Sequence, residues 1–568
     1  MIKSYKKNQG STNPHHSIPW GVRKKYRMDI KSARMLLFNH MSAFEEKDSR
    51  QIYIPWAIFD DLRDEKNYRY GNVATLPRMR SRVLEKYAGT HEVPEPTLAG
   101  LSREIERSRF GDVLAYLAKK KILSGAIPCP PFMLHALPKT YYIKLNAREE
   151  LQSSHYTPLY GGGASYTSFA EALSKAIGEL LERYVLLTNF FHKKNKIMRM
   201  KLGDERIPHA LIHETPRFFE WQRKYVPHGL TSELLTMPAT HTAVVHCVKG
   251  ESLNMGKKIY MPLQHVQWGP RYTQGTFGAD TYALSPKTTS GAGGGFTLID
   301  ATLSGLCELL ERDGFLIYWL NRLSPRRIRI DEQDSDRFMP RFLEVYRSLA
   351  DRGYQVYFLD TTTDVHIPSI ACLILAPLPH GRKSISVTGK CHPDPHRALE
   401  LSLLEHALLL NPSIPKAGIS VSDPAYVPFA DATIGKKERT DLWRSGNMTD
   451  KINFFISGKE ISSGEWAHEF PAPPTDQDNA LSSVLNEFSR MEKQHGEAYE
   501  VFRYEARHHI LEELEYHVVK IVVPALIPLY LREHAAFLDC RRLREVPCKL
   551  GYQAAPIDQY NPLPHPFP

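Results

Sequence analysis

Four glutamates in two similar segments are the residues of this 568-residue chain best suited to chemistry. The segments are YGGGASYTSFAEALSKAIGELLERY at 160–184 and SGAGGGFTLIDATLSGLCELLERD at 290–313. Each contains a Glu-x-x-Glu-Arg motif, and the two motifs supply Glu179, Glu182, Arg183, Glu308, Glu311 and Arg312. Carboxylates three residues apart lie on the same side of a helix, about one turn apart. Each pair is therefore a candidate for binding a cation.

The same segments predict the elements that must position these glutamates. In each segment, a glycine-rich stretch leads through a capping box into a long helix that ends at the Glu-x-x-Glu-Arg motif. The boxes run from Ser168 to Glu171 and from Thr297 to Asp300, where a hydroxyl and a carboxylate satisfy the first free N–H groups of the helix. The repetition indicates two copies of one structural unit.

The two predicted helices differ in what surrounds their carboxylates. In the first helix, Glu171, Lys175, Glu179 and Glu182 form one polar stripe, so a solvated face without chemistry stays an open interpretation. The second helix is apolar around most of its circumference, and a buried carboxylate needs a metal, an arginine or a proton. If the copies face each other, four carboxylates converge, which suits Mg²⁺ completed by phosphate oxygens. Glycine-rich loops at helix N-termini are where such phosphates would bind.

Other kinds of site find little support in the sequence. No Gly-x-x-x-x-Gly-Lys-[Ser/Thr] motif is present, which excludes a P-loop. The seven cysteines are scattered without a Cys-x-x-Cys pair, which argues against a zinc ribbon and suits a reducing cytosol. The His pairs at 15–16 and 508–509 lack the spacing of a zinc helix, and Cys307 is interpreted as core packing.

The pattern along the chain predicts an α+β fold of mixed sheets and helices. Apolar runs at 354–360, 369–377 and 515–526 indicate strands, and they alternate with helical periodicity. Residues 433–480 are polar and are expected to be rich in loops.

A separate N-terminal domain is expected before this body. Residues 36–125 have a mainly helical pattern, and the proline-rich stretch 127–138 resembles a linker. We therefore expect a boundary near 150, between a mainly helical domain at 1–150 and a catalytic domain at 151–568.

The N-terminal region carries the excess of positive charge. Residues 1–150 contain 27 Lys and Arg against 16 Asp and Glu, and the whole chain has a formal net charge of +10. This excess indicates either a solvated arm or a region that binds an acidic partner. Nucleic acid is an unlikely partner, because no base-stacking motif or zinc-finger spacing accompanies the charge.

Several motifs together resemble the YcaO superfamily, in its azoline-forming cyclodehydratase branch. The resemblance runs from about residue 155 to the C-terminus. It rests on AEALSKAIGELLERY, TTSGAGGGFTLIDATLSGLCELLERDG, GYQVYFLDTTTDVHIPSIACLIL, CHPDPHRALELSLLEHALL and the terminal NPLPHPFP. It implies a YcaO-type fold and ATP-dependent phosphorylation of a peptide amide oxygen, after which a neighbouring Cys, Ser or Thr closes a thiazoline or oxazoline ring.

The resemblance also implies roles for individual residues. The expected Mg²⁺ ligands are Glu179, Glu182, Glu308 and Glu311. The residues expected to contact ATP or its metal are Ser290, Gly293, Asp300, Arg183, Arg312 and Glu405.

On the third helix this sequence departs from the family pattern. Members of the family show Arg-x-x-x-Glu-x-x-x-Gln there, whereas this chain has Leu401, Glu405 and Leu409 in that register. Losing the arginine and glutamine would remove phosphate and nucleotide contacts. Two alternatives to cyclodehydration therefore stay open: a degenerate peptide-binding or scaffold subunit, and a thioamide-forming enzyme of the same family.

The proline-rich tail at 562–568 is expected to take part in catalysis. Pro564, Pro566 and Pro568 favour a stiff extended chain that loses little entropy when it docks. The resemblance implies that this tail projects toward the active site, where the carboxylate of Pro568 would take a proton from the attacking side chain. Composition alone would favour a tail without a role.

The expected partners follow from the resemblance and from the N-terminal charge, and the expected location follows from the apolar pattern of the chain. The substrate would be a precursor peptide with leader and core parts, and the basic N-terminal region would help to bind an acidic leader. A leader-binding partner protein, a flavin-dependent dehydrogenase and a homodimer are further expectations. The longest apolar run, 518–531, is broken by Lys520, Pro524 and Pro528, so we expect no membrane helix and a cytoplasmic protein.

Overall fold

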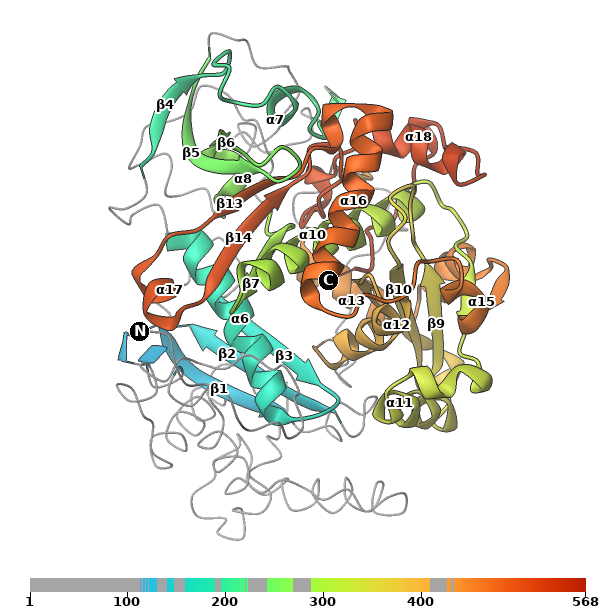
Figure 1. Ribbon diagram of the computed structural model, residues 1–568. Helices are drawn as coiled ribbons and strands as arrows, with labels where there is room; N and C mark the ends of the chain where they lie inside the picture. Colours follow the sequence, from blue (N-terminus) through green and yellow to red (C-terminus); the bar gives the residue numbers. More distant parts are fainter. Residues whose placement is uncertain are drawn as a thin grey trace.

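The computed structural model describes the part of the chain that resembles the family and little of what precedes it (Figure 1). The described residues are single positions between 113 and 120, and 122–129, 140–147, 159–188, 196–219, 221–222, 243–268, 288–408, 426–430 and 434–567. The expected helical domain thus lies almost wholly outside the described residues.

Within the described part of the chain, the strands form three sheets. The first is antiparallel, with the order β1 (Leu123–Cys129), β2 (Tyr141–Ala147), β3 (Tyr160–Ser165). The second has the order β11 (Lys383–Cys391), β10 (Ser369–Pro377), β9 (Gln355–Asp360), β8 (Arg327–Arg329), β12 (Glu460–Ser462). The third has the order β4 (Met198–Lys201), β5 (Val244–Ser252), β13 (Phe502–Glu505), β14 (His517–Val522), β7 (Ala292–Gly295), and β6 (Lys257–Pro262) also pairs with β5.

Helices surround and connect these sheets, which confirms the expected α+β class. The longest are α6 (Phe169–Thr188), α10 (Leu298–Leu320) and α16 (Gln477–His495). The others are α7 (Ala210–His213), α8 (Leu263–Val266), α11 (Pro340–Asp351), α12 (Pro395–Leu404), α13 (Lys436–Arg444), α14 (Thr449–Ile452), α15 (Ser463–Ala467), α17 (His509–Leu514) and α18 (Arg541–Lys549). No helix of the described residues combines the length and apolar character needed to cross a membrane.

Helix α10 lies at the centre of the molecule (Figure 1). It packs against β7 and β14 of one sheet, against β10 and β11 of another, and against α16 and α18. Most of its side chains are buried, which agrees with its apolar sequence. Of the two motif glutamates on this helix, Glu311 is buried and Glu308 is half-buried.

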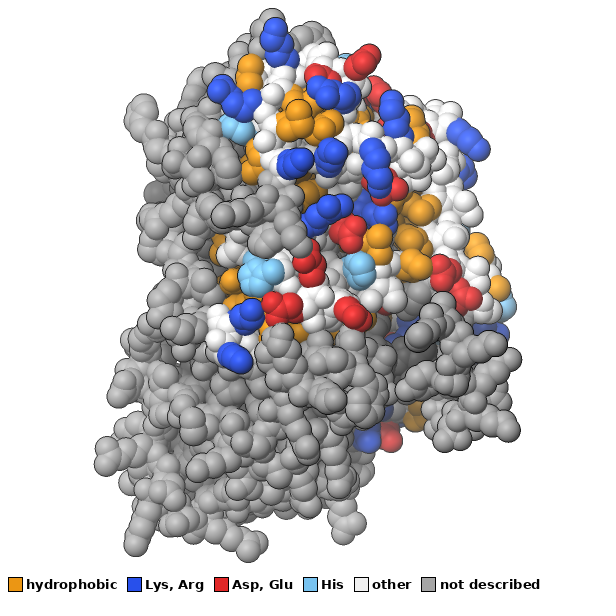
Figure 2. All heavy atoms as spheres, turned by 60° about the vertical axis from the view of Figure 1, so that its left-hand side comes forward, with side chains coloured by type: hydrophobic (Ala, Val, Ile, Leu, Met, Phe, Trp, Pro, Cys, Tyr) orange, Lys and Arg blue, Asp and Glu red, His pale blue; other side chains and the backbone are white. Residues whose placement is uncertain are grey.

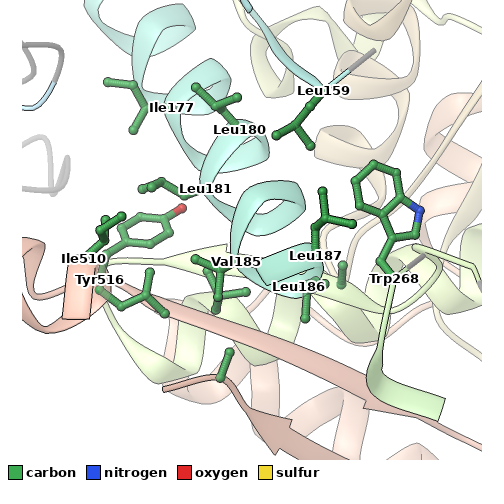
Figure 3. Close-up of a cluster of buried hydrophobic side chains, with 14 of the residues drawn as sticks. Leu159, Ile177, Leu180, Leu181, Val185, Leu186, Leu187, Trp268, Ile510 and Tyr516 are labelled. Carbon is green, nitrogen blue, oxygen red and sulfur yellow. The ribbon is translucent and has the colours of Figure 1, made fainter. Parts of the chain in front are cut away.

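Helix α6 lies on the first sheet, against β2 and β3, and also touches β7 and β14. Its apolar face packs into a core that it shares with distant parts of the chain (Figure 3). In that view, Leu181 and Val185 of the helix lie close to Ile510 and Tyr516. This contact brings the first unit against the sheet that carries the second.

Some local expectations need correction. Neither helix ends at the Glu-x-x-Glu-Arg motif, because both continue as apolar helix that the core can bury, to Thr188 and to Leu320. The expected loop region 433–480 contains α13, α14, α15 and β12, because short amphipathic turns there pack apolar side chains such as Trp443 and Trp466 into the core.

The expected linker and the expected domain boundary both fall within the part of the chain that forms the first sheet. The stretch 127–138 begins inside β1, and its remaining residues from 130 onward lie outside the described residues. Strand β1 pairs with β2, and β2 pairs with β3, so one sheet joins residues on both sides of position 150. A cut at 150 would divide this sheet.

Positive charge also gathers outside the N-terminal region. Figure 2 shows Lys and Arg side chains over the upper part of the described surface, where β4, β5 and β6 lie. The exposed residues of these strands include Arg199, Lys201, Lys249, Lys257 and Lys258.

Candidate active site

In the first unit, the first glutamate of the motif is held on both of its oxygens. Gly162 N–H donates to Glu179 Oε2, and Arg183 Nη2 lies 2.5 Å from Glu179 Oε1. Arg183 also donates to the carbonyl oxygen of Tyr160 at 2.8 Å, so the glycine strand β3 and the helix α6 fix the guanidinium together. The carboxylate has a defined orientation before any ligand arrives.

The second unit repeats this arrangement. Gly291 N–H donates to Glu308 Oε2 at 2.7 Å, and Arg312 Nη2 lies 3.4 Å from Glu308 Oε1. In both units the amide comes from the glycine stretch and the arginine from one turn further along the helix. The sequence repeat is thus a repeat of side-chain geometry.

Glu182 is the point of contact between the units. A methyl group at Gly294 of β7 would lie 2.8 Å from Glu182 Oε1, so the α6 carboxylate lies against the second glycine stretch. Burial raises the pKa of Glu182 to about 8, and the carboxylates of Glu179 and Glu308 add to the effect. The two glutamate pairs therefore lie close enough to influence each other, and we refer to them together as the glutamate cluster.

Glu311 is buried, with 6% of its surface exposed. Burial raises its pKa to about 7, with Arg312 and Lys390 opposing the effect and Glu308 and Glu405 adding to it. Its nearest cation is Arg312, whose Nε lies 3.3 Å from Glu311 Oε1. The ionised form of Glu311 would be favoured by a further cation.

Two lysines that the sequence analysis did not assign to the site lie beside the glutamates. Lys390 Nζ, from β11, is 3.4 Å from Glu405 Oε1. Lys520, from β14, is buried and donates to the carbonyl oxygens of Thr288, at 2.6 Å, and Ser290. Burial lowers the pKa of Lys520 to about 8, against the opposing charge of Glu308. A single lysine inside an apolar strand was the signal that could have identified Lys520.

Two of the expected cofactor contacts have structural partners. Ser290 Oγ accepts a hydrogen bond from Leu529 N–H at 3.2 Å. A methyl group at Gly293 would lie 2.1 Å from the carbonyl oxygen of Ala301, so only glycine lets β7 approach α10 so closely. Both residues shape the glycine stretch that supplies the Gly291 amide.

The remaining expected contacts divide between the helix start and the third helix. Asp300 N–H donates to Thr297 Oγ1 at 3.0 Å, so Asp300 serves the N-cap of α10. Glu405 follows α12 and acts on the charge of Glu311. Leu401 packs against an apolar core, and Leu409 lies outside the described residues.

The capping boxes are present in altered form. Ser168 Oγ accepts from Glu171 N–H at 3.1 Å, but the Glu171 carboxylate accepts from the hydroxyls of Ser165, at 2.6 Å, and Thr167. These neighbouring hydroxyls compete with the N-cap amide for the carboxylate.

The described tail at 560–567 packs against the rest of the chain and is mostly buried. Its carbonyl oxygens accept hydrogen bonds from three aromatic side chains. The donor–acceptor pairs are Tyr426 Oη to Pro562 O at 2.5 Å, Trp319 Nε1 to Leu563 O at 3.3 Å and Trp443 Nε1 to Pro564 O at 2.8 Å. An extended proline-rich segment held through its carbonyls by aromatic donors is a common mode of peptide recognition.

The tail ends beside the second glutamate pair. The ring of Phe567 lies 4.8 Å from the Arg312 guanidinium, and a methyl group at Gly389 would lie 2.8 Å from that ring. Pro564 and Pro566 are both buried along this path, whereas Pro568 lies outside the described residues. The described tail thus reaches the arginine that holds Glu308.

The donor set fits Mg²⁺ bound together with a nucleotide. The carboxylates supply hard oxygen ligands, and burial raises the pKa values of Glu182 and Glu311, so a bound cation would favour their ionised forms. Within the described ranges, no group of three or more His, Cys, Asp or Glu is placed to hold a metal ion by itself. Mg²⁺ in nucleotide sites typically uses one or two carboxylates and completes its shell with phosphate oxygens and water.

Comparison with known proteins bears on the fold and the cofactors. The model of the family described as "YcaO cyclodehydratase, ATP- and Mg²⁺-binding" matches residues 161–527. This match confirms the resemblance found in the sequence and the expected cofactors, ATP and Mg²⁺.

Solved structures show the same fold at low sequence identity. A heterocyclase in complex with substrate and cofactor is 18% identical, with a TM-score of 0.56 over 75% of this chain and 53% of that chain. The heterocyclase TruD is also 18% identical, with a TM-score of 0.51 over 90% of this chain and 72% of that one.

Among curated proteins, an uncharacterized protein in the tfuA 3′ region of Rhizobium leguminosarum bv. trifolii is 32% identical over 131 residues. The chain spans 30% of that relative's length and about half of the first heterocyclase chain.

Proposed function

Because the chain belongs to the YcaO family, whose model covers residues 161–527, we propose that it is an ATP-dependent peptide cyclodehydratase. The substrate is a ribosomal precursor peptide, in which Cys, Ser or Thr side chains close onto the preceding amide. The products are thiazoline or oxazoline rings, water being lost from the peptide overall.

The chemistry explains why such a site needs many charges. An amide oxygen is a poor leaving group, and ATP with Mg²⁺ supplies the phosphoryl group that makes it a good one. The glutamates orient the metal, and the cations around them balance the phosphate charge. Gly162 and Gly291 hold the first glutamate of each pair so that little reorganisation is needed when the nucleotide binds.

One observation carries the proposal: both Glu-x-x-Glu-Arg units hold their first glutamate by the same amide and arginine contacts. Glu182 of the first unit also lies against Gly294 in the glycine stretch of the second. A solvated polar face would have no reason to repeat the same amide and arginine contacts in both units.

The tail supports the same proposal. Its described part ends with Phe567 on Arg312, beside the second pair of glutamates. We assign Pro564 and Pro566 the role of holding the tail extended, so that it orients the reacting part of the peptide over the site. The role expected for the Pro568 carboxylate stays a prediction.

Mass spectrometry tests this function directly. The full chain is incubated with ATP, Mg²⁺ and a short Cys-, Ser- and Thr-rich peptide encoded beside its gene. We expect the peptide to lose one water per ring while phosphate is released, and Glu308→Gln serves as the inactive control. In a parallel incubation with added sulfide, an exchange of oxygen for sulfur would identify the thioamide reaction instead. A peptide without mass change in either incubation would contradict catalysis.

A scaffold subunit is the second candidate, favoured by Leu401. The apolar side chain stands where the family has a phosphate-binding arginine, and it packs into the core. A scaffold would bind the peptide without releasing phosphate, whereas a cyclodehydratase releases phosphate only when the peptide is present.

For the N-terminal region we propose binding of an acidic leader peptide. Its 27 Lys and Arg against 16 Asp and Glu would attract such a leader. Exposed charges are screened over about 10 Å at 0.1 M salt, so affinity should fall steeply as salt is raised. The truncation that tests it should remove residues 1–112, because Val113, Tyr116 and Leu117 are buried in the core that α6 packs into.

A further partner protein for the leader, a flavin-dependent dehydrogenase that oxidises the rings and a homodimer belong to the same proposal. Co-purification from cells that express the neighbouring genes, followed by mass spectrometry of the intact assembly, tests these partners.

A further inference from the structure

The third helix lacks a cation where the family resemblance expects one. Position 401 on α12 holds leucine, and Glu405 follows four residues later. Residues four apart lie on the same face of a helix, one turn from each other. The face that would carry an arginine is therefore the face that carries Glu405.

Lys390 lies against this face from the neighbouring strand. Its Nζ is 3.4 Å from Glu405 Oε1. The end of β11 is fixed on the third helix by a second contact, in which Thr388 Oγ1 donates to the carbonyl oxygen of Ser402 at 2.7 Å. The position of Lys390 beside Glu405 thus follows from how the strand packs on the helix.

The end of β11 also lies next to the glutamate cluster. A methyl group at Gly389, the residue before Lys390, would be 3.0 Å from Glu311 Cγ of α10. The strand that carries Lys390 is thus packed between the third helix and the helix that carries the second glutamate pair. The guanidinium of Arg183, in contrast, is taken up by Glu179 and the Tyr160 carbonyl.

The ammonium group of Lys390 has more N–H donors than its hydrogen bond to Glu405 uses. Its ammonium group carries three N–H donors, and among the described residues its hydrogen-bond partner is Glu405. A compact ammonium charge is a common ligand of phosphate groups.

We propose that Lys390 supplies, from strand β11, the phosphate-binding cation that the third helix lacks at Leu401. Its ligand is a phosphate group of the nucleotide at the glutamate cluster, so this inference rests on the proposed ATP-dependent function. The loss of arginine at position 401 then does not make the site degenerate, because an adjacent element presents a positive charge to the same place.

Moving the charge between the two positions tests the proposal. The variants are Lys390→Met, Lys390→Arg and the double variant with Lys390→Met and Leu401→Arg. Lys383→Met is the matched control, since Lys383 stands at the other end of β11 and donates to Gln355 at 2.7 Å. The readout is the affinity for a non-hydrolysable ATP analogue with Mg²⁺, measured by calorimetry on the full chain without peptide.

We expect Lys390→Met to weaken analogue affinity about 10- to 100-fold, which is typical for a lost charged hydrogen bond. Lys390→Arg and the double variant should recover most of the affinity, which a purely structural role would not explain. Lys383→Met should bind as the wild type does, and thermal unfolding checks that each variant is folded.

The proposal is overturned if Lys390→Met binds the analogue like the wild type. It is also overturned if arginine at 401 fails to restore a lost affinity or if the wild type does not bind the analogue. A wild type that binds the analogue through Lys390 but closes no rings would contradict the proposed function and leave the role of Lys390 standing.

Discussion

The units β3–α6 and β7–α10 share one local design but have different surroundings. Each holds the first glutamate of its motif with a glycine amide and an arginine one turn further along. Helix α6 covers a sheet, whereas α10 is enclosed by two sheets and two further helices. Glu311 is accordingly buried, while its counterpart Glu182 is half-buried.

The difference assigns separate tasks to the two copies. In the second unit, the ring of Phe567 from the tail covers the guanidinium of Arg312. Within the described residues, the tail makes no such contact with Arg183 of the first unit. Strand β3 of the first unit belongs to the same sheet as β1 and β2, which lie at the end of the basic N-terminal region. We therefore expect the copies to contribute equally to metal binding and unequally to the peptide reaction.

The largest expected effect comes from removing one carboxylate charge from either unit. Glu308→Gln and Glu179→Gln should each lower ATP turnover at least about 100-fold, because a metal ligand is lost from a partly buried cluster. Phosphate release measures the rate, and circular dichroism checks the fold. Glu171→Gln, on α6 but away from the cluster, is the control. Wild-type turnover in both Glu308→Gln and Glu311→Gln would refute the metal site.

Packing of the glycine strands should distinguish the units by stability. A methyl group would lie 1.9 Å from Ala172 O at Gly163 and 2.1 Å from Ala301 O at Gly293. Each Gly→Ala change should cost about 1–3 kcal/mol in the free energy of unfolding. The cost should be greater at Gly293, since α10 is packed on more sides and has less room to move.

Denaturant unfolding measures these costs. Gly464→Ala is the control, because the nearest atom to its new methyl group would be 3.9 Å away. A larger loss at Gly163 than at Gly293 would contradict the view that α10 is the more rigidly held helix.

The stabilisation that Glu171 gives to the start of α6 should depend on pH. Burial would raise the pKa of Glu171, but Lys175 and the hydroxyls of Ser165 and Thr167 outweigh it and hold the pKa at about 2. Because the folded pKa lies below the unfolded value, the ionised carboxylate stabilises the fold above about pH 4.5, and this is lost as the pH falls toward 2.

Glu171→Gln should therefore cost about 2 kcal/mol at neutral pH and nothing near the acid end of this range. Unfolding free energies of both proteins across pH 2–7 measure the difference. A cost that is independent of pH would show that the charge of Glu171 does not stabilise the cap.

The smallest expected effect concerns the tail, which distinguishes the second unit. Trp443→Phe removes the donor to Pro564 O and should slow ring formation about 10-fold, with unchanged binding of the ATP analogue. Deleting 564–568 is the less specific test, because His565 and Phe567 are buried and their loss would expose the core. If Trp443→Phe formed rings at the wild-type rate, the hydrogen bond that holds the tail at Pro564 would not contribute to catalysis.

The sequence by itself determined the local parts of this protein. Periodicity predicted strands that became β9, β10 and β14, and the duplicated Glu-x-x-Glu-Arg motif identified two equivalent units. Patterns of this kind depend on neighbours within a few residues, which the chain carries with it into any fold. Such patterns do not reveal that β2 pairs with β3 across position 150, because this pairing is a contact between separate segments.

Only the tertiary structure decided which charges share the site. Lys390 and Lys520 come from strands far along the chain, and neither belongs to a periodic pattern or a motif. The aromatic donors Trp319 and Trp443 meet the tail for the same reason, from helices well separated in sequence. Electrostatics and hydrogen bonds act through space, so the partners of the glutamates and of the tail were set by how the sheets pack around α10.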